Sequence, residues 1–282
     1  RKISKSQEHH EAGPMEVMER ESADALRYWA TTGRTGADSP LSTETLTTGR
    51  RLITKLWNAS RFAQGHLADY IAEVFTDELL PTDRWLLSRL ASTIAQATKE
   101  LDSYEYASAR AEVERFFWSD LCDNYLELAK ARLYGAPGLE RRAAQWTLYQ
   151  ALLTVLKLLA PYLPYITEEI YQGLFRERET AQSIHLAKWP QEHPEWLDAQ
   201  AEALGTSLLE ILRQVRRYKA EHGLSVGAEL ETLSINMHPA QLSAFNQILT
   251  DLKSATRAKQ IAFKEMGESH QVLGEKVVQI GV

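Results

Sequence analysis

The sequence contains little cysteine and no long apolar run, and both shortages narrow the class of protein. Cys122 is the single cysteine among 282 residues, so neither a disulfide framework nor a cysteine-based zinc site can form. No apolar run approaches the length of a membrane span, and the N-terminal residues do not form a signal peptide. We therefore expect a cytoplasmic protein with no membrane association. An initiating methionine is also missing, which predicts a piece of a longer protein.

The sequence also has no overall excess of positive charge. The formal net charge is −6 at pH 7, which argues against a protein that coats nucleic acid by overall charge. Hydrophobic residues make up 44% and charged residues 25%, as in an ordinary globular protein. Residues 27–61 differ, because they carry six Arg or Lys and two acids, a local balance of +4. This asymmetry predicts one basic surface on an otherwise acidic protein.

Residues 50–62 have the pattern of an amphipathic helix. Its apolar stripe consists of Leu52, Ile53, Leu56, Ala59 and Ala63. The opposite face carries Arg51, Lys55, Asn58 and Phe62. Two cations, an amide and an aromatic ring suit a polyanion with stackable bases. The alternative is an ordinary solvated face of a helical bundle.

The remaining pattern is mainly helical and ends in a mixed segment. Helices are expected over residues 15–32, 43–76, 139–160 and 199–222, and a further long helical stretch is expected to begin at Pro81. On the last of these, Arg213, Arg216 and Arg217 lie opposite the apolar side. The tail predicts strands at 229–236 and 259–264, a helix at 239–253, and a short hairpin at 272–282. Aromatic residues near 116–130 are expected in the core.

Several segments carry recognisable motifs in a fixed order. They are Lys2-Ile-Ser-Lys-Ser6, Lys55-Leu-Trp-Asn-Ala-Ser-Arg-Phe62, and residues 116–130, 161–171, 183–190 and 216–225. Together they resemble the valyl-tRNA synthetases, a family of class I aminoacyl-tRNA synthetases. The resemblance extends from residue 2 to about residue 265.

The resemblance implies a role for the first motif. In this family two lysines on a mobile loop approach the triphosphate of ATP, which is bound with magnesium, and stabilise the departing pyrophosphate. It therefore implies catalytic roles for Lys2 and Lys5, and ATP contacts from Lys2, Ser4, Lys5 and Ser6. The family usually continues Lys-Gly-Asn, whereas this chain has Gln7-Glu8-His9, which puts loop mobility and phosphate affinity in question. We expect no metal site from His9, His10 and Glu11.

The resemblance also implies the architecture. The expected fold is mainly α, an anticodon-binding helical bundle of class I synthetases followed by a small α/β C-terminal unit. Residues 1–40 would hold the loop and stem-contact linker helices, residues 41–196 the bundle, and residues 197–282 a long helix with the α/β unit. Trp57, Asn58 and Phe62 are expected to lock the first bundle helix to segment 21–32. That leaves Arg51, Lys55 and Arg61, with Arg213, Arg216 and Arg217, as candidate tRNA contacts.

By resemblance the parent enzyme is a monomer that attaches valine to its tRNA using ATP. The catalytic and editing domains would lie upstream, so this chain alone would lack the adenylate site, bind no ATP and be inactive. Its expected partners are valine tRNA and those upstream domains. Two alternatives stay open. One is a free-standing, non-catalytic relative that binds tRNA or protein, and the other is a helical protein-interaction scaffold with no RNA role.

Overall fold

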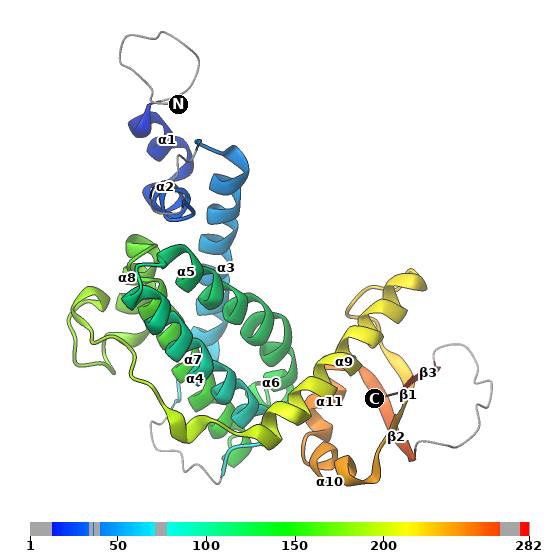
Figure 1. The fold of residues 1–282 in the computed structure, drawn as a ribbon. Helices are drawn as coiled ribbons and strands as arrows, with labels where there is room; N and C mark the ends of the chain where they lie inside the picture. Colours follow the sequence, from blue (N-terminus) through cyan, green and yellow to red (C-terminus); the bar gives the residue numbers. More distant parts are fainter. Residues whose placement is uncertain (1–12, 34–35, 37–39, 71–77, 266–276, 282) are drawn as a thin grey trace. The chain divides into compact units, whose positions relative to one another are not determined.

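The computed structural model describes residues 13–33, 36, 40–70, 78–265 and 277–281 (Figure 1). The described residues are mainly helical and end in a small parallel sheet, which confirms the expected fold class. They form two compact units, each built from separate segments. The first contains Arg1–Ala68, Thr93–Arg115 and Tyr149–Glu192, and the second contains Asp69–Ser92, Phe116–Leu148 and His193–Val282. The contiguous domain ranges expected from the sequence stay a prediction.

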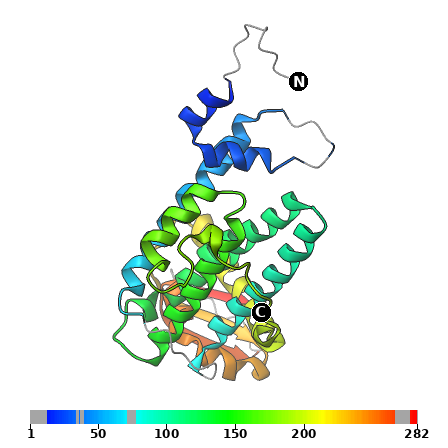
Figure 2. The ribbon, with the colours of Figure 1, turned by 90° about the vertical axis from the view of Figure 1, so that its left-hand side faces the viewer.

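The first unit is built on the long helix α3 (Thr43–Leu67). The Ser42 hydroxyl caps it by accepting a hydrogen bond from the Thr45 amide at 3.2 Å. Helices α1 (Pro14–Glu21) and α2 (Ala23–Ala30) lie beside the first half of α3 (Figures 1 and 2). The helix expected at 43–76 is confirmed as far as Leu67, and residues 71–77 lie outside the described part.

Further helices complete the first unit. They are the C-terminal parts of α4 (Pro81–Asp102) and α7 (Leu139–Leu159), then α5 (Tyr106–Arg115), α8 (Pro164–Ile170), the π-helix η3 (Tyr171–Phe175) and the 3-10 helix η4 (Ile184–Leu186). The apolar run that ends α7 is fully buried at Leu152, Val155 and Leu159. Burial of this run confirms its expected place at the centre of the bundle.

The second unit begins with the N-terminal parts of α4 and α7. It adds the π-helix η2 (Phe116–Tyr125), α6 (Leu126–Leu133), the 3-10 helix η5 (Pro194–Trp196) and α9 (Ala199–Glu221). Asp198 caps α9 by accepting from the amides of Gln200 at 3.0 Å and Ala201 at 2.9 Å. Phe116, Phe117 and Tyr125 are fully buried, as expected for core aromatics.

A three-stranded sheet lies in the C-terminal part of the second unit. Its order is β2-β1-β3, with β1 (Leu230–Met237) paired in parallel to both β2 (Ala258–Glu265) and β3 (Val277–Gly281). The strands expected at 229–236 and 259–264 are confirmed. Most of the hairpin expected at 272–282 lies outside the described residues. Its described part, Val277–Gly281, is β3, which pairs in parallel with β1.

The connection between β1 and β2 also differs from expectation. Instead of a single helix at 239–253, it contains α10 (Pro239–Gln247) and α11 (Leu249–Thr256). The two helices separate at Ile248, whose φ of −109° and ψ of 16° are not helical. A parallel pair of strands requires a crossover of this kind, and helices usually supply it.

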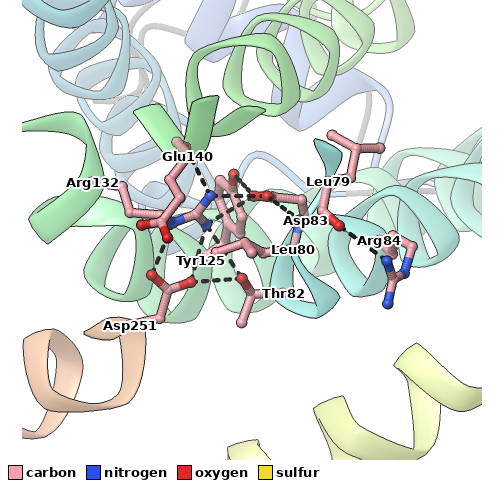
Figure 3. A network of polar contacts seen from close by, with 9 residues as sticks. All are labelled: Leu79, Leu80, Thr82, Asp83, Arg84, Tyr125, Arg132, Glu140 and Asp251. Atoms are coloured by element: carbon pink, nitrogen blue, oxygen red, sulfur yellow. Dashed lines mark hydrogen bonds and ion pairs between the residues drawn. The ribbon is translucent and has the colours of Figure 1, made fainter. Parts of the chain in front are cut away.

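A buried cluster of charges joins α4, η2, α6 and α11 within the second unit (Figure 3). The Arg132 guanidinium donates two hydrogen bonds to Asp83, both at 2.9 Å, and two to Asp251, at 2.8 and 3.0 Å. Thr82 donates to Asp251 at 2.6 Å, and Tyr125 donates to Asp83 at 2.6 Å. Burial lowers the pKa of Arg132, but the two carboxylates outweigh it and hold that pKa well above its usual range. The cluster therefore fixes four elements around one charged side chain.

Candidate nucleic-acid interface

Cationic side chains of α3 line two different faces of the helix. Arg51 and Arg61 are exposed, and neither makes a hydrogen bond or ion pair with a described residue. Lys55 is half-buried one turn after Arg51. A rotation of about 100° per residue places Arg61 roughly 80° around the helix from Arg51. The three predicted contacts are therefore not one stripe, because Arg61 lies on the side of α3 that faces α8.

A groove lies on that side, between α3 and the continuous segment α8–η3. One hollow of about 290 Å³ is lined from α3 by Trp57, Ser60, Arg61 and Gln64, and from α8–η3 by Glu169, Ile170, Gly173 and Leu174. A second hollow of about 380 Å³ includes Ile53, Tyr165 and Glu169. Because Glu169 lines both hollows, they adjoin, and we call them together the α3–α8 groove. Sequence reasoning missed this site, although Trp57 and Arg61 at i and i+4 were a signal for one of its walls.

The N-terminus of α8 is held by a side chain from α2. The Asp24 carboxylate accepts hydrogen bonds from the backbone amides of Tyr165 at 3.2 Å and Ile166 at 2.8 Å. Burial raises the pKa of Asp24, and the two amide hydrogen bonds partly oppose that rise. α8 has no cap from its own preceding residue, Leu163, so Asp24 supplies the partners that its first amides need. This contact fixes the wall of the groove that carries Tyr165.

The expected lock between α3 and segment 21–32 uses other residues. Trp57 is 41% exposed and Asn58 is also exposed, so the expectation is wrong for both. The ring of Phe62 lies 4.5 Å from that of His66 on the same helix. The contact instead uses the start of α3, where Leu46 packs in a cluster with Ala25 and Val17. Trp57 is thereby left available at the groove.

Gly49 completes this contact between α2 and α3. A Cβ atom built there would lie 3.0 Å from the Tyr28 side chain, so glycine permits the close approach of the two helices.

The cations of α9 fall into two kinds. Arg213 is paired with Glu210 at 2.6 Å and Arg217 with Glu221 at 2.7 Å, and all four side chains are substantially exposed. Arg216 is half-buried and donates to the Asp123 carbonyl at 2.6 Å and to the Asn124 side chain at 3.0 Å. Exposed ion pairs contribute little stability, so Arg213 and Arg217 could exchange their partners for phosphate at low cost. Arg216 has a structural role, since it ties α9 to η2.

The remaining candidates belong to the N-terminal motif and its neighbours. Lys2, Ser4, Lys5 and Ser6, with the neighbouring His9, His10 and Glu11, lie outside the described residues. Within the described ranges, no group of three or more His, Cys, Asp or Glu side chains is arranged to hold a metal. None of the helices described here is long and apolar enough to cross a membrane.

The fold is similar to that of a solved LeuRS–tRNA–LeuAMS ternary complex from Agrobacterium radiobacter K84. The TM-score is 0.53 at 15% sequence identity, over 92% of this chain and 31% of that chain. The likeness shows that the two proteins share a fold over this region. Residues 83–234 match the anticodon-binding domain of tRNA ligase. The chain belongs to this family of anticodon-binding domains.

Valine–tRNA ligases are among the curated relatives of the chain, which confirms the resemblance expected from the motifs. The chain is 38% identical to the enzyme of Thermococcus kodakarensis over 280 residues, 99% of this chain and 31% of that protein. It is 40% identical to the enzyme of Methanopyrus kandleri over 262 residues, 90% of this chain and 28% of that protein. The chain therefore spans less than a third of the length of these relatives.

Proposed function

We propose that this chain is the tRNA-binding part of a valine–tRNA ligase and that it binds the anticodon arm of valine tRNA. The observation that carries the proposal is the match to valine–tRNA ligases at 38% identity over 99% of the chain. The family match over residues 83–234 supports an anticodon-arm contact. Arg51 and Arg61 are exposed, have no ion-pair partner among the described residues, and supply groups that can neutralise phosphate.

The proposal is tested by the salt dependence of tRNA binding. Valine tRNA should shift the mobility of the chain at low salt, with affinity falling linearly in log K against log salt. Arg51→Glu should weaken binding and reduce that slope by about one, because one phosphate contact is lost. Lys99→Glu is the matched control, since Lys99 is exposed on α4, is outside the predicted contacts and changes charge equally.

Two results would count against the proposal. The absence of binding at low salt would exclude both RNA functions and leave the protein-interaction scaffold. Equal effects of Arg51→Glu and Lys99→Glu would mean that the cationic face of α3 points away from RNA.

The enzymatic part of the proposal concerns the longer protein. We propose that it joins valine to tRNA using ATP with magnesium, and that Lys2 and Lys5 stabilise the departing pyrophosphate. Lys5→Ala in the longer protein should slow valyl-adenylate formation by orders of magnitude while tRNA binding persists. An unchanged adenylation rate would mean that the departure at Gln7-Glu8-His9 has removed this loop from catalysis. The present chain alone should form no adenylate.

A further inference from the structure

Five of the side chains that line the α3–α8 groove carry polar groups with no partner among the described residues. None of Trp57, Arg61, Gln64, Tyr165 and Glu169 forms a side-chain hydrogen bond or ion pair with a described residue. The other polar side chains of α8–η3 do have partners, as Glu168 does with the Ser183 hydroxyl at 2.9 Å and Tyr171 does with the Ala181 carbonyl at 2.7 Å. A concentration of unused donors and acceptors in a hollow is typical of a binding site.

Two aromatic rings are presented along the same groove. Trp57 is 41% exposed and Tyr165 is 67% exposed, on opposite walls. Large aromatic rings are usually buried because each removes a large apolar area from water. Exposed rings beside unpartnered polar groups suit a flat ligand that stacks and also forms hydrogen bonds. Unpaired nucleobases have these properties, and proteins bind them by stacking on aromatic side chains.

The charges along the groove favour base edges over phosphates at its centre. Glu169 lines both hollows, and its carboxylate would repel a phosphate placed there. A carboxylate accepts hydrogen bonds from exocyclic amino groups, such as that of cytosine. Arg61 lies further along α3 and can contact a phosphate or stack on a base. The α3 wall from Ile53 to Gln64 is roughly 16 Å long at 1.5 Å per residue, which is enough for more than one nucleotide.

We propose that the α3–α8 groove binds unpaired bases of an RNA strand. Trp57 and Tyr165 provide the stacking surfaces, and Glu169 accepts a hydrogen bond from an exocyclic amino group. The inference rests on the proposed function, since tRNA would be the natural source of such a strand. The groove is preorganised, because Asp24 fixes the start of α8 and thereby the backbone of Tyr165.

The structure offers a variant that blocks the groove without disturbing its walls. Gly173 lines the groove, and a Cβ atom built on it would meet no other atom within 4 Å. Gly173→Leu should therefore fill the open space. Gly65 on α3 is also exposed, has equally free surroundings and does not line the groove. Gly65→Leu is the matched control for the change in side chain.

The experiment measures the affinity of the full chain for three RNA hairpins by fluorescence anisotropy at several salt concentrations. One has an unpaired loop containing cytosine and adenine, one has a loop of uridines, and one has its loop residues base-paired by an added strand. The first hairpin should bind most tightly. Trp57→Ala and Gly173→Leu should each weaken it by about five- to a hundredfold, the range of single base–aromatic stacks. The slope of log K against log salt concentration should stay unchanged, because these substitutions remove no phosphate contact.

Glu169→Gln tests the hydrogen bond separately. It should reduce the preference for the cytosine- and adenine-containing loop over the uridine loop, because uracil has no exocyclic amino group. Thermal unfolding of each variant checks that the fold is retained, and Gly65→Leu should bind as the unchanged chain does.

The outcomes separate this inference from the proposed function. If tRNA binds normally but neither Trp57→Ala nor Gly173→Leu changes the affinity for the first hairpin, the inference is wrong and the proposed function stands. A protein segment would then be the alternative ligand of the groove. If the groove variants affect hairpin binding while the chain shows no salt-dependent binding of valine tRNA, the proposed function fails and the base site stands. If no RNA binds at low salt, both fail.

Discussion

Replacing Arg132 by Met should be among the most damaging single changes to the second unit. The Arg132 side chain is 1% exposed, and those of Asp83 and Asp251 are 0% exposed. The substitution leaves two buried carboxylates without a cation, and their remaining donors are the Thr82 and Tyr125 hydroxyls and the backbone amide of Leu80. Removing one partner of a buried ion pair typically costs about 3–5 kcal/mol. We expect a loss of that size in the free energy of unfolding.

The assay is urea unfolding followed by circular dichroism, with Arg213→Met as the control. Arg213 is 66% exposed and pairs with Glu210 on the same helix, so its loss should change stability by no more than about 0.5 kcal/mol. In a thermal scan Arg132→Met should lower the melting temperature by roughly 6–20 °C, at about 2–4 °C per kcal/mol. A loss below about 1 kcal/mol, or one equal to that of the control, would refute the assignment of the cluster as a stabilising centre.

The pH dependence gives a second check on the same cluster. Burial already raises the pKa of Asp251, although Arg132 opposes that rise. Without Arg132 the folded pKa should rise further above the unfolded value, so the folded state holds a proton that the unfolded state has lost. Stability then falls as pH rises through that window. The loss in the free energy of unfolding caused by Arg132→Met should therefore grow from acidic to neutral pH. Combining Arg132→Met with Asp83→Asn and Asp251→Asn should reduce this loss, because no buried carboxylate is then left without a cation.

Three further predictions concern backbone packing and titration. Gly205→Ala should destabilise the protein by about 1–3 kcal/mol in urea unfolding, because the new Cβ would lie 2.1 Å from buried Trp85, and an unchanged midpoint would contradict this contact. Gly65→Ala, with no atom within 4 Å, should instead stabilise by about 0.5–1 kcal/mol through helix propensity, and a loss of stability would contradict the open surroundings. Asp24 has a folded pKa raised above 3.8, so its contribution to stability should fall as pH rises through that pKa. Asp24→Asn should remove this slope from unfolding curves measured across acidic pH, and an identical slope would show that another group is responsible.

The periodicity of apolar residues predicted where the helices lie, but it did not predict which other elements they contact. Leu52, Leu56 and Ala63 are buried as the apolar stripe of α3 indicated, because the helical repeat alone sets which side chains share a face. The same repeat could not show what covers the opposite side. Trp57 was expected to contact segment 21–32, but it lines a groove with Glu169, far along the chain.

The tail shows the same limit in a sheet. The alternation that predicted β1 and β2 follows from the two-residue repeat of a strand. Pairing partner and direction do not follow from that repeat, and the parallel pairing of β3 with β1 is visible only in the fold.

The sequence by itself determined the family, the mainly helical class and the apolar face of each long helix, because motifs and periodicity are local properties of the chain. Tertiary structure alone decided which polar residues meet. Arg132 pairs with Asp83, 49 positions away, and with Asp251, 119 positions away, and no local repeat links them. The α3–α8 groove likewise exists because α8 packs beside α3, which brings residues more than 100 positions apart to one hollow. Burial and contact across such distances depend on how whole helices pack, which is why the candidate base site emerged from the fold.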